Sequence, residues 1–168
     1  QDGARDIYRC SANGLEMLGF TVTGEDICNV LGIEFDDPIP LIRESEQEGN
    51  KRDFSAGISV DCDGDDFSGT IEGSIEFVEA LTTYTVPAGT FADVIRIRVR
   101  ATASAAGESL PFDTEFYFGR NVGPLREMDR EEGFEEELVS ATVCGVNYPL
   151  PTPTPTLAIT PTITPTPT

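Results

Sequence analysis

Apolar residues at every second position are the feature that most limits how this chain can fold. From Phe54 onward, apolar and small side chains alternate with polar ones in several successive runs. A period of two places one set of side chains on one face of a β-strand and the other set on the opposite face. The runs are Ile58–Cys62, Phe67–Phe77, Ile95–Ala101 and Phe112–Phe118, followed by shorter stretches at Leu125–Asp129 and Phe134–Val143. This pattern predicts a mainly β fold.

Short turn sequences separate these runs. The segment Asp63–Asp66 contains an Asp-Gly pair, and Val86–Gly89 contains both proline and glycine, which is typical of hairpin turns. Short turns join antiparallel neighbours. We therefore expect six or so strands in a single curved antiparallel sheet or half-barrel.

The segment that precedes these strands has a mixed pattern. Asp26 stands at the capping-box position after Thr23, ahead of an apolar stretch that ends at Leu31, and this predicts a short N-terminal helix. Pro38 and Pro40 then exclude a helix and keep the following segment extended. We expect the helix and the extended segment to cover one face of the sheet.

The charge balance excludes several classes of partner. The chain of 168 residues has 11 Lys and Arg residues against 30 Asp and Glu residues, a net charge of −19. A surface of this sign repels phosphate backbones and anionic membranes, so no nucleic-acid partner is expected. The sequence also lacks a run of about 18 apolar residues, and we therefore predict no membrane span.

The absence of histidine argues against catalysis. Without histidine the chain has no Ser-His-Asp or Cys-His arrangement and no histidine base, and most zinc sites are excluded as well. Disulfide formation would remove thiol nucleophiles too. We therefore predict a protein that is not an enzyme and has no cofactor, apart from the calcium candidate considered below.

Four widely spaced cysteines indicate an oxidising compartment. Cys10, Cys28, Cys62 and Cys144 form no CxxC pair, and no charged-then-apolar leader precedes them in the numbered chain. We interpret the chain as a mature secreted protein with two disulfides, located outside the cell or on its surface. Three connectivities are open, and the favoured one joins Cys10 to Cys28 and Cys62 to Cys144.

The composition changes completely after Tyr148, which divides the chain into a β domain at residues 1–148 and a Pro/Thr-rich extended tail at residues 149–168. Alternating proline and threonine favours polyproline II geometry, as in a linker or stalk. The tail threonines are candidates for O-glycosylation: Thr152, Thr154, Thr156, Thr160, Thr162, Thr164, Thr166 and Thr168.

The middle of the tail has a second pattern. Leu157, Ile159 and Ile163 alternate with small or hydroxylated residues, so an extended tail has one apolar face. Such a segment suits docking on a neighbouring subunit by strand addition, and repeated head-to-tail docking produces a fibre. These three residues are therefore the candidate subunit-docking residues.

The Asp63–Asp66 turn is also the candidate metal site. Asp61, Asp63 and Asp65 match the first three ligand positions of an EF-hand loop, but Asp66 replaces the required glycine. Glu72, at the twelfth position, lies too far along the next strand to complete the site. A looser calcium site that uses Asp63, Asp65 and Asp66 remains, with an acidic solvated turn as the alternative.

Two further features have competing interpretations. The cations Arg96, Arg98 and Arg100 share one strand face, where they suit an anionic glycan or pair with acids on neighbouring strands, and we favour the pairing. The predicted acidic partners are Glu72, Glu76, Asp113 and Glu115. The last long strand carries the phenylalanines Phe112, Phe116 and Phe118. They either line a lipid pocket or fill the core, and we favour the core.

Four segments together resemble a family. They are Phe35–Leu41, the Val-Pro-Ala-Gly-Thr-Phe turn at Val86–Phe91, Phe118–Glu127, and Glu137–Ser140. They resemble uncharacterised bacterial envelope or secreted domains with a curved LolA-like antiparallel sheet, in which V-P-A-G-T-F and G-V-G-L-type turns precede strands. The chain departs from that pattern because it has no tryptophan. The resemblance implies a fold and an envelope or secreted location, and no catalytic residues.

Two functions follow as expectations. The first is a structural subunit of an extracellular filament or surface layer, which self-associates through its tail and carries glycans there. The second is a periplasmic or cell-surface module that binds lipid or glycan, with the tail as a stalk.

Overall fold

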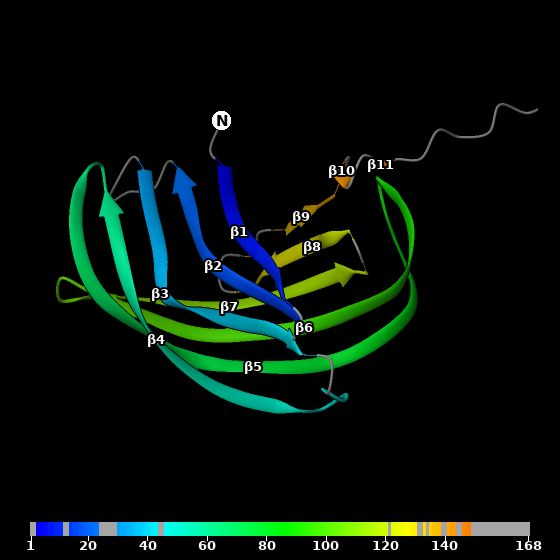
Figure 1. Ribbon diagram of the computed structural model, residues 1–168, viewed down its shortest axis with the longest axis horizontal. Helices are drawn as coiled ribbons and strands as arrows, with labels where there is room; N and C mark the ends of the chain where they lie inside the picture. Colours follow the sequence, from blue (N-terminus) through cyan, green and yellow to red (C-terminus); the bar gives the residue numbers. More distant parts are fainter. Residues whose placement is uncertain are drawn as a thin grey trace, which may run out of the picture.

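A computed structural model describes residues 3–11, 14–23, 30–43, 46–120, 122–130, 133, 135–138, 141–143 and 146–148. Nine strands form one antiparallel sheet in which every strand neighbours the one before it in the sequence. The strands are β1 (Gly3–Ser11), β2 (Gly14–Thr23), β3 (Val30–Arg43), β4 (Lys51–Cys62), β5 (Asp65–Val86), β6 (Gly89–Ala105), β7 (Glu108–Gly119), β8 (Gly123–Asp129) and β9 (Glu135–Glu137). The short strands β10 (Ala141–Val143) and β11 (Val146–Tyr148) form a separate pair. The sheet curves into a half-barrel (Figure 1).

The predicted hairpin turn at Asp63 is confirmed. Cys62 pairs with Asp65, so only Asp63 and Gly64 lie in the turn, and both have positive φ angles, 54° and 95°. This is the backbone of a type I′ turn, whose twist matches that of the strands it joins. The two-residue turn between β6 and β7, Ala106-Gly107, has the same pattern with φ angles of 54° and 90°.

Strand β3 produces the half-barrel shape because it pairs with β4 over only part of its length. The pairing runs from Leu31 opposite Cys62 to Phe35 opposite Ile58 and ends there. Beyond Phe35, β3 remains paired with β2 alone and packs on the concave side of the sheet. Pro38 lies in this second half, where its missing N–H costs no hydrogen bond to β4.

One arginine connects β3 and β4 in the region where the two strands are no longer paired. The Arg52 guanidinium on β4 donates to the backbone carbonyl of Pro40 on β3. It also forms an ion pair with Glu46 at 2.5 Å, and both side chains are largely buried. A partly buried pair of this kind is weakly screened by solvent, so it fixes the position of β3 over the sheet.

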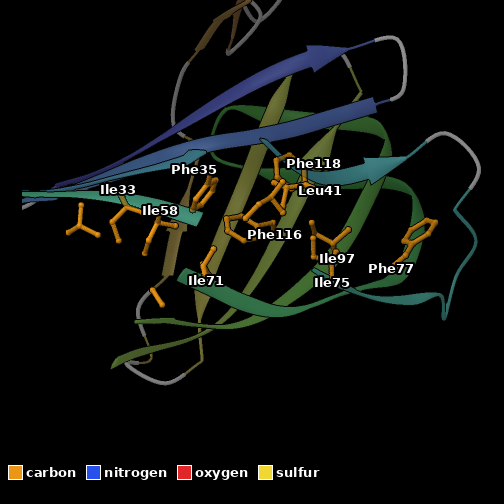
Figure 2. Packing of buried hydrophobic residues seen from close by; sticks show 13 residues of the cluster. Ile33, Phe35, Leu41, Ile58, Ile71, Ile75, Phe77, Ile97, Phe116 and Phe118 are labelled. Atoms are coloured by element: carbon orange, nitrogen blue, oxygen red, sulfur yellow. The ribbon is translucent and has the colours of Figure 1, made fainter. Parts of the chain in front are cut away.

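The core fills the concave side. Figure 2 shows its labelled side chains gathered between the strands, with Leu41 and Phe35 contributed by β3. Phe116 and Phe118 are 5% and 4% exposed and belong to this core. The core interpretation of these two phenylalanines is therefore confirmed, and Phe112 packs against the same cluster while half-buried.

A second, smaller cluster lies at the far end of β5 and β6. Its buried members are Val86, Ala88, Phe91, Val94, Tyr117 and Leu125. The β5–β6 turn reaches across to the segment after β9, because the Ala88 N–H donates to the carbonyl of Leu138 at 2.9 Å. The Val-Pro-Ala-Gly turn predicted from the sequence is thus part of the packed structure.

The predicted N-terminal helix is not supported. Val30 and Leu31, placed at its end, begin strand β3 and pair with Thr23 and Val22 of β2. Residues 24–29, which held its predicted start, lie outside the described residues, and no helix occurs in the part of the chain that the structure describes. Tertiary pairing of an apolar stretch next to an existing hairpin outweighs the weak preference given by one capping pattern.

Candidate functional site

Edge strand β1 brings its side chains to strands β7 and β8 on the concave side of the sheet. The Tyr8 ring lies edge-on to the ring of Phe118, with 5.8 Å between centroids. The carboxyl groups of Asp6 and Glu127 share a hydrogen bond across the same gap. Strands that are far apart in the sheet order therefore meet here and close one side of the half-barrel.

Burial changes the acidity of both carboxyl groups. Burial, followed by the negative charge of Asp6, raises the pKa of Glu127 to about 8. Burial also raises the pKa of Asp6, against the lowering effect of its hydrogen bonds with Tyr8 and Glu127. The Tyr8 hydroxyl donates to Asp6 Oδ2 at 2.5 Å, so Asp6 is an acceptor there. The raised pKa values of both acids favour a state in which the two carboxyl groups share one proton.

The outer face of β6 carries the predicted arginine ladder, and its pairing with neighbouring strands is confirmed. Arg98 binds both carboxylate oxygens of Asp113, at 2.6 and 2.5 Å, and its guanidinium holds the pKa of Asp113 below its usual value. Arg100 lies 3.6 Å from Glu76 and 3.6 Å from Asp113. The ladder therefore stabilises the sheet, as the sequence suggested.

Among the described residues, the predicted partners Glu72 and Glu115 form no ion pair with the three ladder arginines. Arg96 pairs at 3.1 Å with Glu79, which faces it because the β5–β6 register shifts between Phe77 and Glu79. Glu115 pairs at 2.7 Å with Arg130, and its side chain is only 3% exposed. Alternation along one strand cannot reveal a bulge in its neighbour, so the sequence did not indicate Glu79 as the partner of Arg96.

Two tyrosines and one further arginine extend the ladder, and no sequence pattern indicated them. Tyr84 and Tyr117 stack with centroids 4.6 Å apart, and the guanidinium of Arg126 lies 5.4 Å from the Tyr117 ring. Arg126 also donates to the Tyr84 hydroxyl at 2.8 Å and pairs with Glu135 at 2.7 Å. Contacts between strands so distant in sequence leave no local pattern. The cluster joins the outer faces of β5, β7 and β8.

The candidate calcium ligands lie in an exposed turn. Asp63, Asp65 and Asp66 are all exposed, and the Asp61 carboxylate accepts a hydrogen bond from the Gly64 N–H at 2.8 Å. That bond stabilises the turn itself. Among the described residues, no three His, Cys, Asp or Glu side chains are arranged to hold a metal ion. The structure therefore supplies no metal-binding geometry at this turn.

The cysteines are described only in part. Cys62 is half-buried near the end of β4 and is in the disulfide-bonded form. No disulfide joins two cysteines whose side chains are both described, because the side chains of Cys10, Cys28 and Cys144 lie outside the described residues. The pairing of Cys62 with Cys144 stays a prediction.

Strand register nevertheless favours one connectivity. Cys62 lies opposite Leu31, only three residues after Cys28 in the sequence. Cys10 pairs with Leu15, whereas Val30 pairs with Thr23 at the other end of β2. Leu15 and Thr23 are about 26 Å apart at the usual strand rise, and a disulfide requires Cα atoms within about 7 Å.

We therefore expect a bond between Cys28 and Cys62, in place of both bonds that the sequence favoured, Cys10 with Cys28 and Cys62 with Cys144. Mass spectrometry of peptides digested without reduction tests this connectivity. A linked pair that contains Cys28 and Cys62 is the expected product. A peptide that links Cys10 to Cys28 would contradict the register of β1, β2 and β3.

The two edges of the nine-stranded sheet differ. Strand β9 is three residues long and consists of exposed glutamates, the charged and short form of edge that resists pairing. Strand β1 is nine residues long and, among the described strands, pairs only with β2. Its Ile7 side chain is 39% exposed. Of the two edges, β1 is the one suited to accept another strand.

The tail residues proposed for glycosylation and docking belong to residues 149–168. The eight candidate threonines lie outside the described residues, as do the docking candidates Leu157, Ile159 and Ile163. Within the described ranges, no helix is long and apolar enough to cross a membrane. Comparison with known proteins adds no relative, since no family model, curated protein or solved structure matches the chain.

Proposed function

We propose that the protein is a non-enzymatic structural subunit of an extracellular filament or surface layer. In this proposal the C-terminal tail of one subunit adds to the β1 edge of the next subunit. The single observation that carries the proposal is the nine-residue β1 edge, which has no second strand partner among the described strands. An edge of this length is a template for an added strand.

The length and chemistry of the tail support this choice of edge. The apolar alternation from Leu157 to Ile163 covers about 23 Å at strand rise, and β1 covers about 30 Å. The tail has no charge, so it can approach a subunit with a net charge of −19 without repulsion. Pro161 lacks an N–H, which an edge strand tolerates when that position faces solvent.

The filled concave side supports a structural function over a lipid carrier. Ile58, Ile75 and Ile97 are each at most 2% exposed, and Phe116 and Phe118 stack against one another among them. A carrier of the LolA-like kind needs this space for its ligand. Here the side chains of the protein itself occupy it.

Removal of the tail tests the proposal. Deletion of Pro151–Thr168 is expected to abolish polymers seen by electron microscopy, while the thermal unfolding of the domain stays unchanged. A tail of the same length made of glycine and serine is the matched control for spacing, and it should also fail to polymerise. Salt should promote polymers of the intact protein, because it screens the repulsion between acidic subunits.

Two outcomes would contradict the proposal. Polymers that persist after the deletion would show that the tail is not the connecting element. Monomers of the intact glycosylated protein at every salt concentration would instead favour a cell-surface module that binds glycan or lipid, with the tail as its stalk.

A further inference from the structure

The seam between β1 and β8 contains two half-buried acids, Asp6 and Glu127, that hydrogen bond to each other. Asp6 projects from the edge strand and Glu127 from β8, and both face the concave side. Tyr8, on the same side of β1, donates to Asp6 and contacts Phe118 of β7. Among the described strands, β1 and β8 are not paired with each other, so side chains make the connection between them.

We propose that Asp6 and Glu127 form a proton-dependent clasp, in which one shared proton holds β1 against β7 and β8 and its loss releases this edge of the half-barrel. The proposal concerns the same strand β1 as the proposed assembly function but is argued from different contacts. It concerns how the half-barrel is closed within one molecule. In Figure 1, β1 passes close to the β7–β8 end of the sheet.

The charges around the pair explain why a single proton matters. Glu127 is surrounded by further acids, with Asp6 on β1, Asp129 on β8 and Glu136 on β9 acting on it. Tyr8 is the other titratable group at the seam, and burial keeps it protonated by raising its pKa. When Glu127 ionises, two adjacent carboxylates repel in a poorly solvated place and the hydrogen bond between them is lost.

The direction of the pH dependence follows from the raised pKa of Glu127. The folded-state pKa of Glu127, about 8, is above its ordinary value of 4.5. The folded form therefore binds this proton more tightly than the unfolded form does. Stability from the clasp is fully present below the ordinary pKa of a glutamate and is lost as the pH rises towards 8.

The composition simplifies the interpretation of pH-dependent changes near pH 8. The chain has no histidine, so any cysteine thiol left outside a disulfide is the one ordinary side chain that titrates between about pH 6 and pH 9. The α-amino group titrates there as well, but it is common to every variant. A change in the β1 seam over this range therefore reports on the clasp.

Nuclear magnetic resonance of the intact protein provides the test. The Tyr8–Phe118 ring contact should give nuclear Overhauser peaks at pH 6 that are lost by pH 9.5. The loss should follow the titration of the Glu127 carboxyl carbon, with a midpoint near 8. Glu127→Gln imitates the protonated acid and should keep the peaks at both pH values. Glu108→Gln, at an exposed site on β7, should behave like wild type.

Three results would overturn the clasp. They are retention of the Tyr8–Phe118 peaks after Glu127 has ionised, titration of Glu127 at its ordinary value, and loss of the peaks at high pH in Glu127→Gln. If Glu127→Gln does not fold, Asp6→Asn removes the second charge from the other side and should likewise keep the contact at pH 9.5.

Discussion

The Leu41→Ala variant is expected to lose about 4 kcal/mol of unfolding free energy. Leu41 is 1% exposed and lies in the second half of β3, beyond the point at Phe35 where pairing with β4 ends. Removing its side chain leaves a cavity where β3 packs on the concave side. For a chain of this size such a loss lowers the melting temperature by about 10 °C.

Leu110→Ala is the matched control, because it makes the same substitution at a site that is 44% exposed. We expect it to cost less than about 1 kcal/mol. Urea unfolding of both variants, followed by circular dichroism, gives the comparison. If Leu41→Ala and Leu110→Ala lost the same unfolding free energy, the second half of β3 would not be packed against the core as described.

The Gly73→Ala variant is expected to lose about 3 kcal/mol, because the position has no room for a methyl group. A Cβ atom there would lie 2.2 Å from the backbone oxygen of Arg100 and 2.7 Å from the Cα of Ala101. Both are atoms of the facing strand β6, which cannot move without disturbing the longest hairpin. The close approach of β5 and β6 thus requires glycine.

Gly32→Ala is the control for Gly73→Ala. A Cβ atom at Gly32 would meet the Asp61 Cβ at 3.7 Å, which is ordinary van der Waals contact. It should change the melting temperature by a few degrees at most, whereas Gly73→Ala should lower it by about 8 °C. A tolerated Gly73→Ala would contradict the tight packing of β5 against β6.

The strands after Phe54 could be predicted because local pattern and tertiary structure agree there. The alternation places Ile71 and Ile75 on one face, and the structure buries both in the concave core. The Asp63-Gly64 turn was predictable for the same reason, since only a few residue pairs accept two positive φ angles. In this region the local sequence pattern is sufficient to predict the strands and the turn.

Before Phe54 the sequence pattern indicated the secondary structure less clearly, and the secondary-structure prediction was partly wrong. The capping pattern around Asp26 suggested a helix, whereas Val30 and Leu31 extend a strand next to β2. The prolines correctly indicated an extended segment, but not that this segment leaves β4 and packs over the core. That path depends on Arg52 and Leu41, whose partners are distant in the sequence.

The acidic seam could not be predicted from the sequence. Asp6 and Glu127 lie at nearly opposite ends of the described chain, and in a sequence with 30 acidic residues nothing distinguishes them. One weak signal exists in retrospect. Asp6 and Tyr8 are two positions apart and therefore lie on the same face of β1, the face that contacts the core. An acid on such a face needs a hydrogen-bonding partner.

Cross-linking between isotopically distinct subunits tests the central claim most directly. A photoreactive residue replaces Ile159 in the tail, and subunits with natural and ¹⁵N isotopes are mixed before assembly and irradiation. The account predicts cross-linked peptides of mixed isotope composition that join the tail to β1 residues such as Ile7. Cross-links that occur only within single chains, or only to strands other than β1, would contradict it.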